Sequence, residues 1–322
     1  MEPKDSIYLR LQAGVFALLA FFAGVGIPAS GLGFSTSVLE SVVAVLPHWT
    51  SIKKSDVKDA PEGSAVAIFG GGYLVTNVHV LGNATTADIR LEDGRMIAVE
   101  IVGRDAKTDI ALLKAPRKFP VLEVAPPPDL GDAVCAVGNQ FGLGISVSCG
   151  VVSAVGRRNI GFNAIEDFIQ TDAAVNPGGS GGALIDDRGR IVGLVSAIFT
   201  KRSDSNIGVN FASSMALVNR VVADLLRYGK VKAGSAGIDV APLKMDQRRK
   251  VTGVTIVKLD RNGPALSGGL QVSDIVTAVG SRRILKPADF YAALYLAKPG
   301  DQITITHVRD GKSATTLIRL TP

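Results

Sequence analysis

The chain has 322 residues, 47% of them hydrophobic and 20% charged, which is typical of a globular protein with two or three hydrophobic cores. The formal net charge is +6, from 35 basic and 29 acidic residues, but the basic residues lie in small scattered groups without interleaved aromatic residues. This pattern argues against a nucleic acid partner. Only two cysteines occur, which excludes a metal site built from paired cysteines, and we expect no metal and no cofactor.

The N-terminal region indicates export from the cytoplasm. Residues 11–39 carry no charge, and residues 11–27 form a nearly continuous apolar run preceded by Lys4 and Arg10. The run is short for a membrane span, yet the best cleavage position, after Ala29, fits the small-x-small rule poorly. We favour a retained membrane anchor in residues 11–27 over a cleaved signal that would release the protein into the periplasm. A buried core helix is a third, less favoured interpretation.

Short strands dominate the next part of the chain. After a charged segment, 51–63, five runs of β-branched and apolar residues between 64 and 114 are separated by turn residues, which predicts antiparallel β-structure. A proline-rich stretch, 115–131, cannot lie in a central strand and is predicted to connect two β units. The two cysteines, Cys135 and Cys149, lie in runs that can form a hairpin. There we favour buried free thiols, with a cross-strand disulfide as the alternative in an oxidising compartment.

The second β unit is predicted to end in a helix. Residues 213–230 have serines able to cap a helix, an apolar face that includes Leu225 and Leu226, and Gly229 as a stop. A further segment of about 85 residues follows, with short strands and a predicted helix at 286–298. We therefore expect an anchor and spacer at 1–35, a β domain of two units at 36–233, and a separate domain at 234–322.

Ser180 is the candidate nucleophile. It lies among glycines in residues 176–184, "NPGGSGGAL", which satisfy the G-x-S-x-G pattern of the α/β-hydrolase nucleophile elbow. That fold is excluded here, because strands rather than a helix are predicted after Ser180 and only His307 follows it, in a different domain. The order His, Asp, Ser is instead that of two-barrel β proteases of the chymotrypsin type.

Elimination selects the partners of Ser180. Of the three histidines, His48 precedes the charged segment and His307 is expected on a surface strand, which leaves His79 at the end of a predicted strand. Asp109 opens an apolar strand, where a carboxylate needs a partner. Asp172 is the runner-up and is better placed to brace the loop before Ser180. The turn aspartates between His79 and Ser180 are expected to be solvated: Asp88, Asp93, Asp105, Asp129 and Asp132.

These residue types suit acyl transfer. A neutral His79 would take the proton of the Ser180 hydroxyl and return it to the leaving amine, while Asp109 holds the imidazole tautomer. Flexible glycines would let the backbone N–H groups of Gly178 and Ser180 form an oxyanion hole.

With these residues assembled, the chain resembles the HtrA (Deg) family of serine proteases. The likeness rests on five segments in that family's order and spacing: "TNVHVL" (76–81), "TDIALLK" (108–114), "GNQFGLG" (138–144), "FIQTDAAVNPGGSGGAL" (168–184) and "NIGVNFA" (206–212). It implies a mainly β fold, with a chymotrypsin-like double β-barrel followed by one PDZ domain. It also implies the triad His79, Asp109 and Ser180 and a homotrimer. Two residues depart from the family pattern: Gln140 stands for a common proline, and Gly179 for a common asparagine.

The resemblance extends to the C-terminal domain and to regulation. Ser235, Ala236, Gly237 and Ile238 match the family's carboxylate-binding loop and strand, so C-terminal peptides are expected to bind there. Arg157 and Arg158, in the segment before the strand that leads to Ser180, are candidates for a regulatory contact with the PDZ domain. An anchor, one protease domain and one PDZ domain is the plan of membrane-anchored family members in the bacterial cell envelope.

The activity implied is an envelope serine endopeptidase that cleaves unfolded, regulatory or membrane-associated proteins in quality control or stress signalling. One alternative is a chaperone or binding module on a protease fold, in which proteolysis is minor. An intact triad argues against it. A second alternative, a purely structural PDZ scaffold, leaves His79 and the segment around Ser180 without a role.

Overall fold

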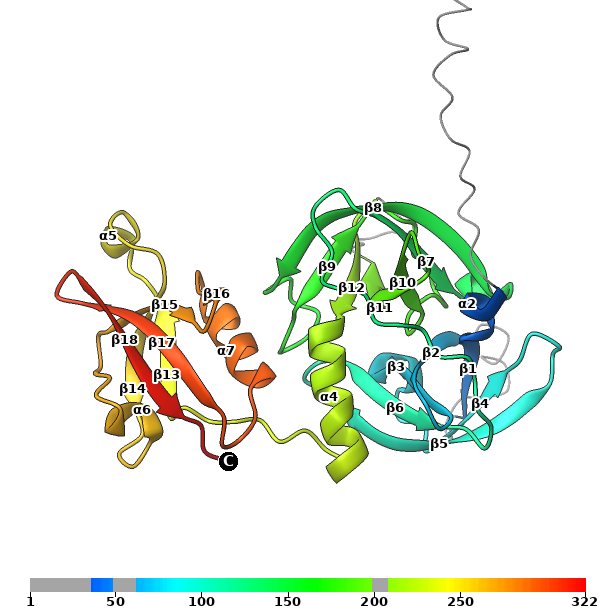
Figure 1. Ribbon diagram of the computed structural model, residues 1–322, viewed down its shortest axis with the longest axis horizontal. Helices are drawn as coiled ribbons and strands as arrows, with labels where there is room; N and C mark the ends of the chain where they lie inside the picture. Colours follow the sequence, from blue (N-terminus) through cyan, green and yellow to red (C-terminus); the bar gives the residue numbers. More distant parts are fainter. Residues whose placement is uncertain (1–35, 49–61, 199–207) are drawn as a thin grey trace, which may run out of the picture. The chain divides into compact units, whose positions relative to one another are not determined.

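The computed structural model describes residues 36–48, 62–198 and 208–322. In this part of the chain two closed antiparallel barrels are followed by a third antiparallel sheet (Figure 1), which confirms the predicted mainly β double-barrel class. The expected anchor, residues 11–27, lies outside the described residues. Within them, no helix has both the length and the apolar character needed to cross a membrane.

The first barrel has the strand order β1-β2-β3-β6-β5-β4. Five of these strands match the predicted runs between residues 64 and 114, whereas β1 was not predicted. Alternate side chains enter its core, where Leu74, Ile89 and Leu113 are fully buried. Helix α2 (Thr36–Glu40) precedes the barrel, and the single-turn helix α3 (Val78–Leu81) follows β3. The strands are β1 (Val42–His48), β2 (Gly63–Phe69), β3 (Tyr73–Asn77), β4 (Thr86–Arg90), β5 (Met96–Asp105) and β6 (Ile110–Lys114).

The second barrel begins after the proline-rich stretch and has the order β10-β11-β12-β9-β8-β7. Its core includes Val152, Leu184 and Val192. A short 3-10 helix, η2 (Gln140–Gly142), lies in the turn between β7 and β8. The strands are β7 (Ala133–Gly138), β8 (Ser146–Arg157), β9 (Phe168–Thr171), β10 (Ala183–Asp186), β11 (Ile191–Ile198) and β12 (Asn210–Ser214).

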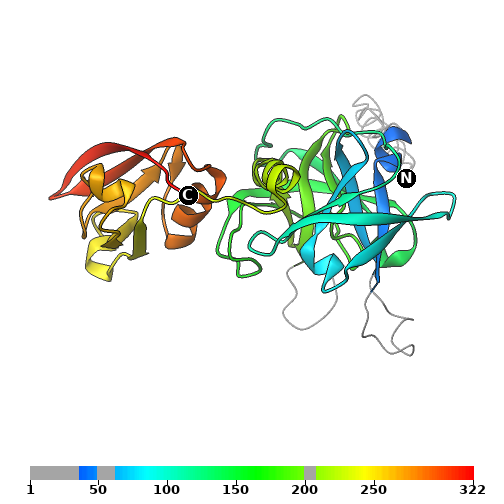
Figure 2. The same ribbon diagram turned by 90° about the horizontal axis from the view of Figure 1, so that it is seen from below.

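Helix α4 (Met215–Tyr228) is the long helix predicted after the second β unit. The Ser214 side chain caps it by accepting a hydrogen bond from the Leu217 N–H, and Gly229 ends it in a left-handed conformation with φ of 67°. The helix packs against β5 and β6 of one barrel and β11 and β12 of the other, across their junction (Figures 1 and 2). The predicted apolar face is correct except for Leu226, which is 39% exposed.

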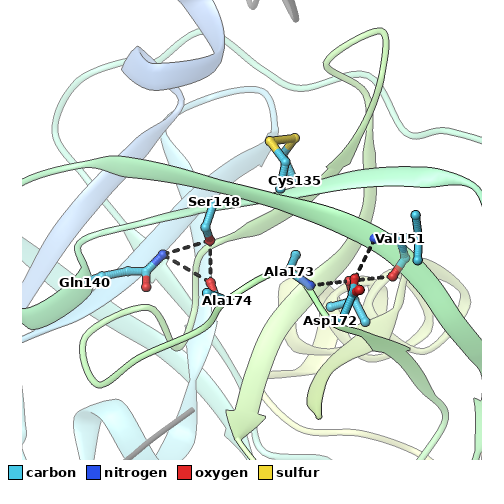
Figure 3. Close-up of a disulfide and its surroundings, with 9 residues drawn as sticks. Cys135, Gln140, Ser148, Val151, Asp172, Ala173 and Ala174 are labelled. Atoms are coloured by element: carbon cyan, nitrogen blue, oxygen red, sulfur yellow. Dashed lines mark hydrogen bonds between the residues drawn. A yellow bond between two sulfur atoms is a disulfide. The ribbon is translucent and has the colours of Figure 1, made fainter. Parts of the chain in front are cut away.

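Cys135 and Cys149 form a disulfide, so the favoured prediction of free thiols was wrong. The two residues are directly opposite each other in the β7–β8 ladder, with their Cα atoms 4.0 Å apart (Figure 3). Cys135 is buried, whereas Cys149 lies on the exposed face of β8. The alternating apolar pattern does not reveal which residues of a hairpin are opposite, because that register depends on the length and conformation of the turn.

The third sheet has the order β13-β14-β15-β17-β18, with β16 paired to β15. Val254, Ile256, Leu270, Phe290 and Ile305 are fully buried in its core. Its strands are β13 (Ile238–Pro242), β14 (Val254–Leu259), β15 (Ile275–Val279), β16 (Arg282–Arg283), β17 (Gln302–Arg309) and β18 (Lys312–Arg319). Its helices are α5 (Met245–Arg248), α6 (Pro264–Ser267) and α7 (Pro287–Leu296), the last of which was predicted from sequence.

The disulfide is expected to stabilise the second barrel. Its cysteines are 14 residues apart in sequence, and closing a loop of this size removes about 3 kcal/mol of chain entropy from the unfolded state. The double variant Cys135→Ser/Cys149→Ser should therefore unfold in guanidinium with a free energy lower by about 3 kcal/mol. A reductant should produce the same loss in the parent and none in the variant. Equal stability of parent and variant would contradict this prediction.

Candidate active site

His79 lies on the α3 turn, immediately after strand β3. Its neighbours Val80 and Leu81 are buried in the first barrel, while half of the His79 side-chain surface is exposed. Strand β3 is fixed at this end because the Asn77 side chain and the Val78 N–H both donate to the Asp109 carbonyl, at 2.9 and 3.1 Å. The imidazole is therefore held at an edge of the barrel core, facing outward.

Asp109 binds His79 through both of its carboxylate oxygens. Oδ2 is 2.6 Å from His79 Nδ1, and Oδ1 accepts a hydrogen bond from the His79 backbone N–H at 2.8 Å. Asp109 is 9% exposed and has a φ of 62°, a left-handed conformation unusual for a residue other than glycine. A carboxylate beside Nδ1 favours the tautomer with the proton on Nδ1, which leaves Nε2 free to accept a proton.

Ser180 lies in a tight turn of the second barrel. Gly178 and Gly181 have φ of 91° and 84°, and a Cβ atom at either position would come within about 2 Å of a backbone oxygen. The Ser180 hydroxyl donates to the Ser196 carbonyl at 3.0 Å. No hydrogen bond joins Ser180 to His79 in the described structure, so this side chain has to rotate before the two can exchange a proton.

Two backbone donors of the turn point to no protein acceptor. The N–H groups of Gly179, Gly181 and Gly182 are bound to carbonyls of Asn176, Val195 and Gly179. Among the residues described, by contrast, no acceptor binds the N–H of Gly178 or of Ser180. These are the two groups predicted to form an oxyanion hole, and their freedom suits that role.

A cavity of about 560 Å³ brings these groups together. It is lined by His79 and Asp109 from the first barrel and by Asn176, Pro177 and Ser180 from the second. The cavity is also lined by Phe162, Val175 and Ser196. The site thus lies between two barrels that are separate in sequence.

The other polar candidates lie elsewhere. Asp172, which begins the loop before Ser180, accepts a hydrogen bond from the Val151 N–H of β8 at 2.7 Å and so joins this loop to β8, as expected (Figure 3). His48 pairs with Asp88 at 2.9 Å. His307, expected on a surface strand, is instead 4% exposed and lies 3.8 Å from Asp274. His307 lies on the same face of β17 as the buried Ile305, whereas Thr306 and Val308 on the other face are half-buried.

Asp105 was expected to be solvated, and that was wrong. It is 8% exposed, and its Oδ2 accepts hydrogen bonds from the hydroxyls of Thr108 and Tyr295 at 2.6 and 2.7 Å. Burial, followed by this bond to Asp105, raises the pKa of the Tyr295 phenol. Because Tyr295 is 190 residues away in helix α7, no local pattern could identify the partner of Asp105.

Comparison with known proteins agrees with this geometry. A family described as a trypsin-like peptidase domain matches residues 63–194, and a PDZ domain family matches residues 206–320. The serine endoprotease DegS of Salmonella typhimurium (strain 14028s) is 33% identical over 265 residues, covering 79% of this chain and 74% of DegS. The chain belongs to the HtrA family of serine endoproteases.

Further members of the HtrA family are similar over most of this chain. The periplasmic serine endoprotease DegP of Escherichia coli K12 is 35% identical over 271 residues. The match covers 80% of this chain but only 56% of DegP, so the chain spans about half the length of such relatives. The solved structure of the HtrA-type protease AlgW with a tripeptide has a TM-score of 0.72 at 32% identity, covering 89% of this chain and 95% of that one.

The PDZ match includes β12 and α4, although β12 is a strand of the second barrel. In the third sheet, the predicted carboxylate loop precedes β13. Ser235 exchanges two backbone hydrogen bonds with Thr321, Ala236 is buried, and Gly237 has a φ of 66°. Ile238 begins β13, which lies at the end of the sheet order and, among the described strands, pairs with β14 alone.

The two candidate regulatory arginines have different surroundings. Arg158 forms an ion pair with Asp167 at 2.6 Å, and Arg282 of β16 reaches the same carboxylate at 3.2 Å. Burial alone would raise the pKa of Asp167, but the guanidinium groups of Arg282 and Arg158 outweigh burial and lower it. Arg157 binds Gln170 at 3.0 Å and is exposed.

Sequence reasoning missed Ser64, the buried serine in β2. Its N–H donates to the Ser180 carbonyl at 2.8 Å, and its hydroxyl donates to the Gly178 carbonyl at 2.7 Å. One signal was available: Ser64 is the polar residue at the start of the apolar run 64–69. A hydroxyl in a buried strand needs a partner. Here the partner is the Gly178 carbonyl in residues 176–182, the turn that contains the candidate nucleophile Ser180 and is called the nucleophile turn below.

The packing of the nucleophile turn predicts a difference between two glycine variants. Gly181→Ala places a Cβ 2.0 Å from the Ser64 carbonyl oxygen, whereas Gly94→Ala, at a similar φ of 82°, meets no atom within 4 Å. In both variants an alanine adopts a left-handed backbone conformation, which lowers the free energy of unfolding by about 1–2 kcal/mol. Gly181→Ala should lose about 2 kcal/mol more in denaturant unfolding, because backbone has to move. Equal losses would show that the turn is not packed as described.

Proposed function

We propose that this protein is a serine endopeptidase of the cell envelope with His79, Asp109 and Ser180 as its triad. The observation that carries the proposal is the two-point binding of His79 by Asp109 in the cavity that also contains Ser180. Two unengaged N–H groups in the same turn support it. Membership of the HtrA family supports the choice of unfolded or regulatory proteins as substrates.

The reaction uses these groups in order. After the Ser180 side chain rotates from the Ser196 carbonyl to His79, its oxygen attacks the substrate carbonyl while Nε2 takes the proton. The N–H groups of Gly178 and Ser180 stabilise the oxyanion, and Asp109 stabilises the imidazolium. His79 then gives its proton to the leaving amine. A water molecule, activated in the same way, releases the acylated Ser180.

Loss of the nucleophile tests this proposal. Ser180→Ala and His79→Ala should each lower cleavage of an unfolded protein by several orders of magnitude, on the order of 10⁶-fold, without unfolding the barrels. The measurement is the rate of peptide release, with circular dichroism as the folding control. Undiminished cleavage by Ser180→Ala would end the assignment. Retained folding assistance by that variant would support an additional chaperone activity.

The contact of Asp109 with His79 Nδ1 is tested by a second variant, Asp109→Asn. In Asp109→Asn the amide can donate to Nδ1, which places the proton on Nε2 and removes the base. We expect turnover to fall by about 10⁴-fold at neutral pH with little change in KM. If turnover falls less than about tenfold, the carboxylate has no role in orienting His79. Ser180→Ala is the baseline for residual activity.

We further propose that residues 11–27 anchor the protein on the periplasmic side of the inner membrane. The uncharged run supports an anchor, the relative DegP of Escherichia coli is named as a periplasmic protease, and the Cys135–Cys149 disulfide suits an oxidising compartment. We also infer a homotrimer from family membership. Recovery of the protein in the soluble periplasmic fraction, beginning at Ser30, would favour cleavage of a signal instead.

The third sheet is proposed to bind the C-terminus of a peptide. An extended peptide can add to the free edge of β13 while its carboxylate meets the loop of Ser235, Ala236, Gly237 and Ile238. The Tyr291 hydroxyl of α7 now accepts a hydrogen bond from the Val240 N–H at 3.4 Å. A peptide that takes this donor must displace Tyr291. The tripeptide in the AlgW structure is consistent with peptide recognition in this family.

Peptide binding is proposed to raise the activity of Ser180 through contacts of the third sheet with the protease barrels. Asp167 is bound by Arg158 and Arg282, and the Lys286 ammonium donates to the Arg158 carbonyl at 3.0 Å. Tyr295 binds Asp105, the last residue of β5 before the turn that leads to Asp109. A peptide can change activity only if it binds the active form more tightly.

Arg158 and Arg157 form a matched pair for testing this coupling. Arg158→Ala should abolish the increase in cleavage caused by peptides with a free C-terminal carboxylate, because it removes one of the two arginines that bind Asp167. Arg157→Ala should keep the increase, since the exposed Arg157 side chain binds Gln170 and not Asp167. The measurement compares free-acid and amide peptides in each variant. An identical peptide response in both variants would contradict the coupling.

A further inference from the structure

The direction of the Gly178 N–H is set by the neighbouring turn of β7 and β8. The Phe141 N–H donates to the Pro177 carbonyl at 2.6 Å. In a trans peptide the C=O and the N–H point in opposite directions, so holding the Pro177 oxygen toward Phe141 directs the Gly178 N–H away from it. Phe141 has a φ of 56°, a costly conformation for this residue, so other contacts must hold its turn in place.

Ser64 is the first of these contacts. Its hydroxyl accepts a hydrogen bond from the Asn139 N–H at 2.8 Å and donates to the Gly178 carbonyl at 2.7 Å. Its own N–H binds the Ser180 carbonyl at 2.8 Å. Ser64 is fully buried, so water cannot replace these partners. One side chain of the first barrel thus connects the Phe141 turn to the nucleophile turn of the second.

Gln140, in helix η2, is the second contact. Its Oε1 accepts a hydrogen bond from the Asn176 side chain at 2.7 Å. Its Nε2 lies 3.2 Å from the Ser148 hydroxyl and 3.4 Å from the Ala174 carbonyl (Figure 3). Gln140 is 8% exposed. The Gln140 side-chain amide thus joins the turn between β7 and β8 to the residues that precede Ser180.

We infer that Ser64 and Gln140 are positioning residues that hold the turn 176–180 with the Gly178 N–H available to an oxyanion. This inference rests on the proposed peptidase function, and neither side chain touches the reacting atoms. Removing either one frees peptide groups of the turn to rotate toward new partners. Because an oxyanion forms only in the transition state, such rotation lowers kcat and leaves KM nearly unchanged.

The test compares Ser64→Ala and Gln140→Ala with a matched control, Ser41→Ala. Ser41 is also a fully buried serine before a strand of the first barrel, but its hydroxyl binds the Ser37 carbonyl, far from the turn in sequence. With a chromogenic peptide substrate, we expect kcat to fall about 100-fold in Ser64→Ala and about 10-fold in Gln140→Ala. KM should stay within about twofold, and Ser41→Ala should match the parent. Equal kcat in all four proteins would overturn the inference.

Hydrogen exchange gives a second readout that does not depend on activity. Amides of residues 138–145 and 174–182 should exchange faster in Ser64→Ala and Gln140→Ala than in the parent and in Ser41→Ala. If the parent and Ser180→Ala cleave the substrate equally poorly, the proposed peptidase function fails. Amide hydrogen exchange would then still test whether Ser64 and Gln140 hold the turn. Unchanged exchange in both variants would overturn that role. Should Ser64→Ala fail to fold, Gln140→Ala decides the outcome.

Discussion

The contact between strand β2 of the first barrel and the nucleophile turn of the second is the constraint on which the site depends. His79 and Asp109 belong to one barrel and Ser180 to the other. The position of Ser180 relative to His79 and Asp109 is therefore set by the packing of the two barrels. Ser64 fixes that packing with its backbone and side chain, and the Thr76 hydroxyl holds the Ser64 carbonyl at 2.7 Å. Because these atoms are buried, their hydrogen bonds cannot be exchanged for water without cost.

The second barrel supports the turn from its other side. The β7–β8 hairpin is closed by the Cys135–Cys149 disulfide. The hydroxyl of Ser148, next to Cys149, donates a hydrogen bond to the Ala174 carbonyl and accepts one from the Gln140 side-chain amide. A covalent bond at the base of this hairpin limits how far its turn can move. The backbone that leads to Ser180 is thus held by groups from both barrels, in strands β2 and β8 and in helix η2. Preorganised donors of this kind need little rearrangement when charge develops.

Charge links the third sheet to the second barrel at Asp167, directly before strand β9. Asp167 is nearly buried and is shared by Arg158 and Arg282, and its lowered pKa means that it stays ionised at neutral pH. A carboxylate whose pKa is depressed on folding adds stability above its unfolded pKa, and that stability is lost as pH falls through the lower folded value. The contact is therefore intact through the neutral range. Asp167 is thus one acidic group bound by an arginine of the protease barrels, Arg158, and by an arginine of the third sheet, Arg282. Peptide binding to the third sheet is proposed to act through this contact.

The sequence alone was sufficient for the strand-rich double barrel, the two long helices α4 and α7, and the choice of His79, Asp109 and Ser180 as candidates. Those inferences used local patterns: alternation within strands, caps at helix ends, and a carboxylate at the start of an apolar strand. Only the tertiary structure decided the disulfide, the burial of Asp105 and His307, and the roles of Ser64 and Gln140. Each of these depends on strand register or on a partner distant in sequence, as with Ser64 and Gly178, 114 residues apart. A local pattern shows that a buried hydroxyl needs a partner, but only the folded chain determines which group it meets.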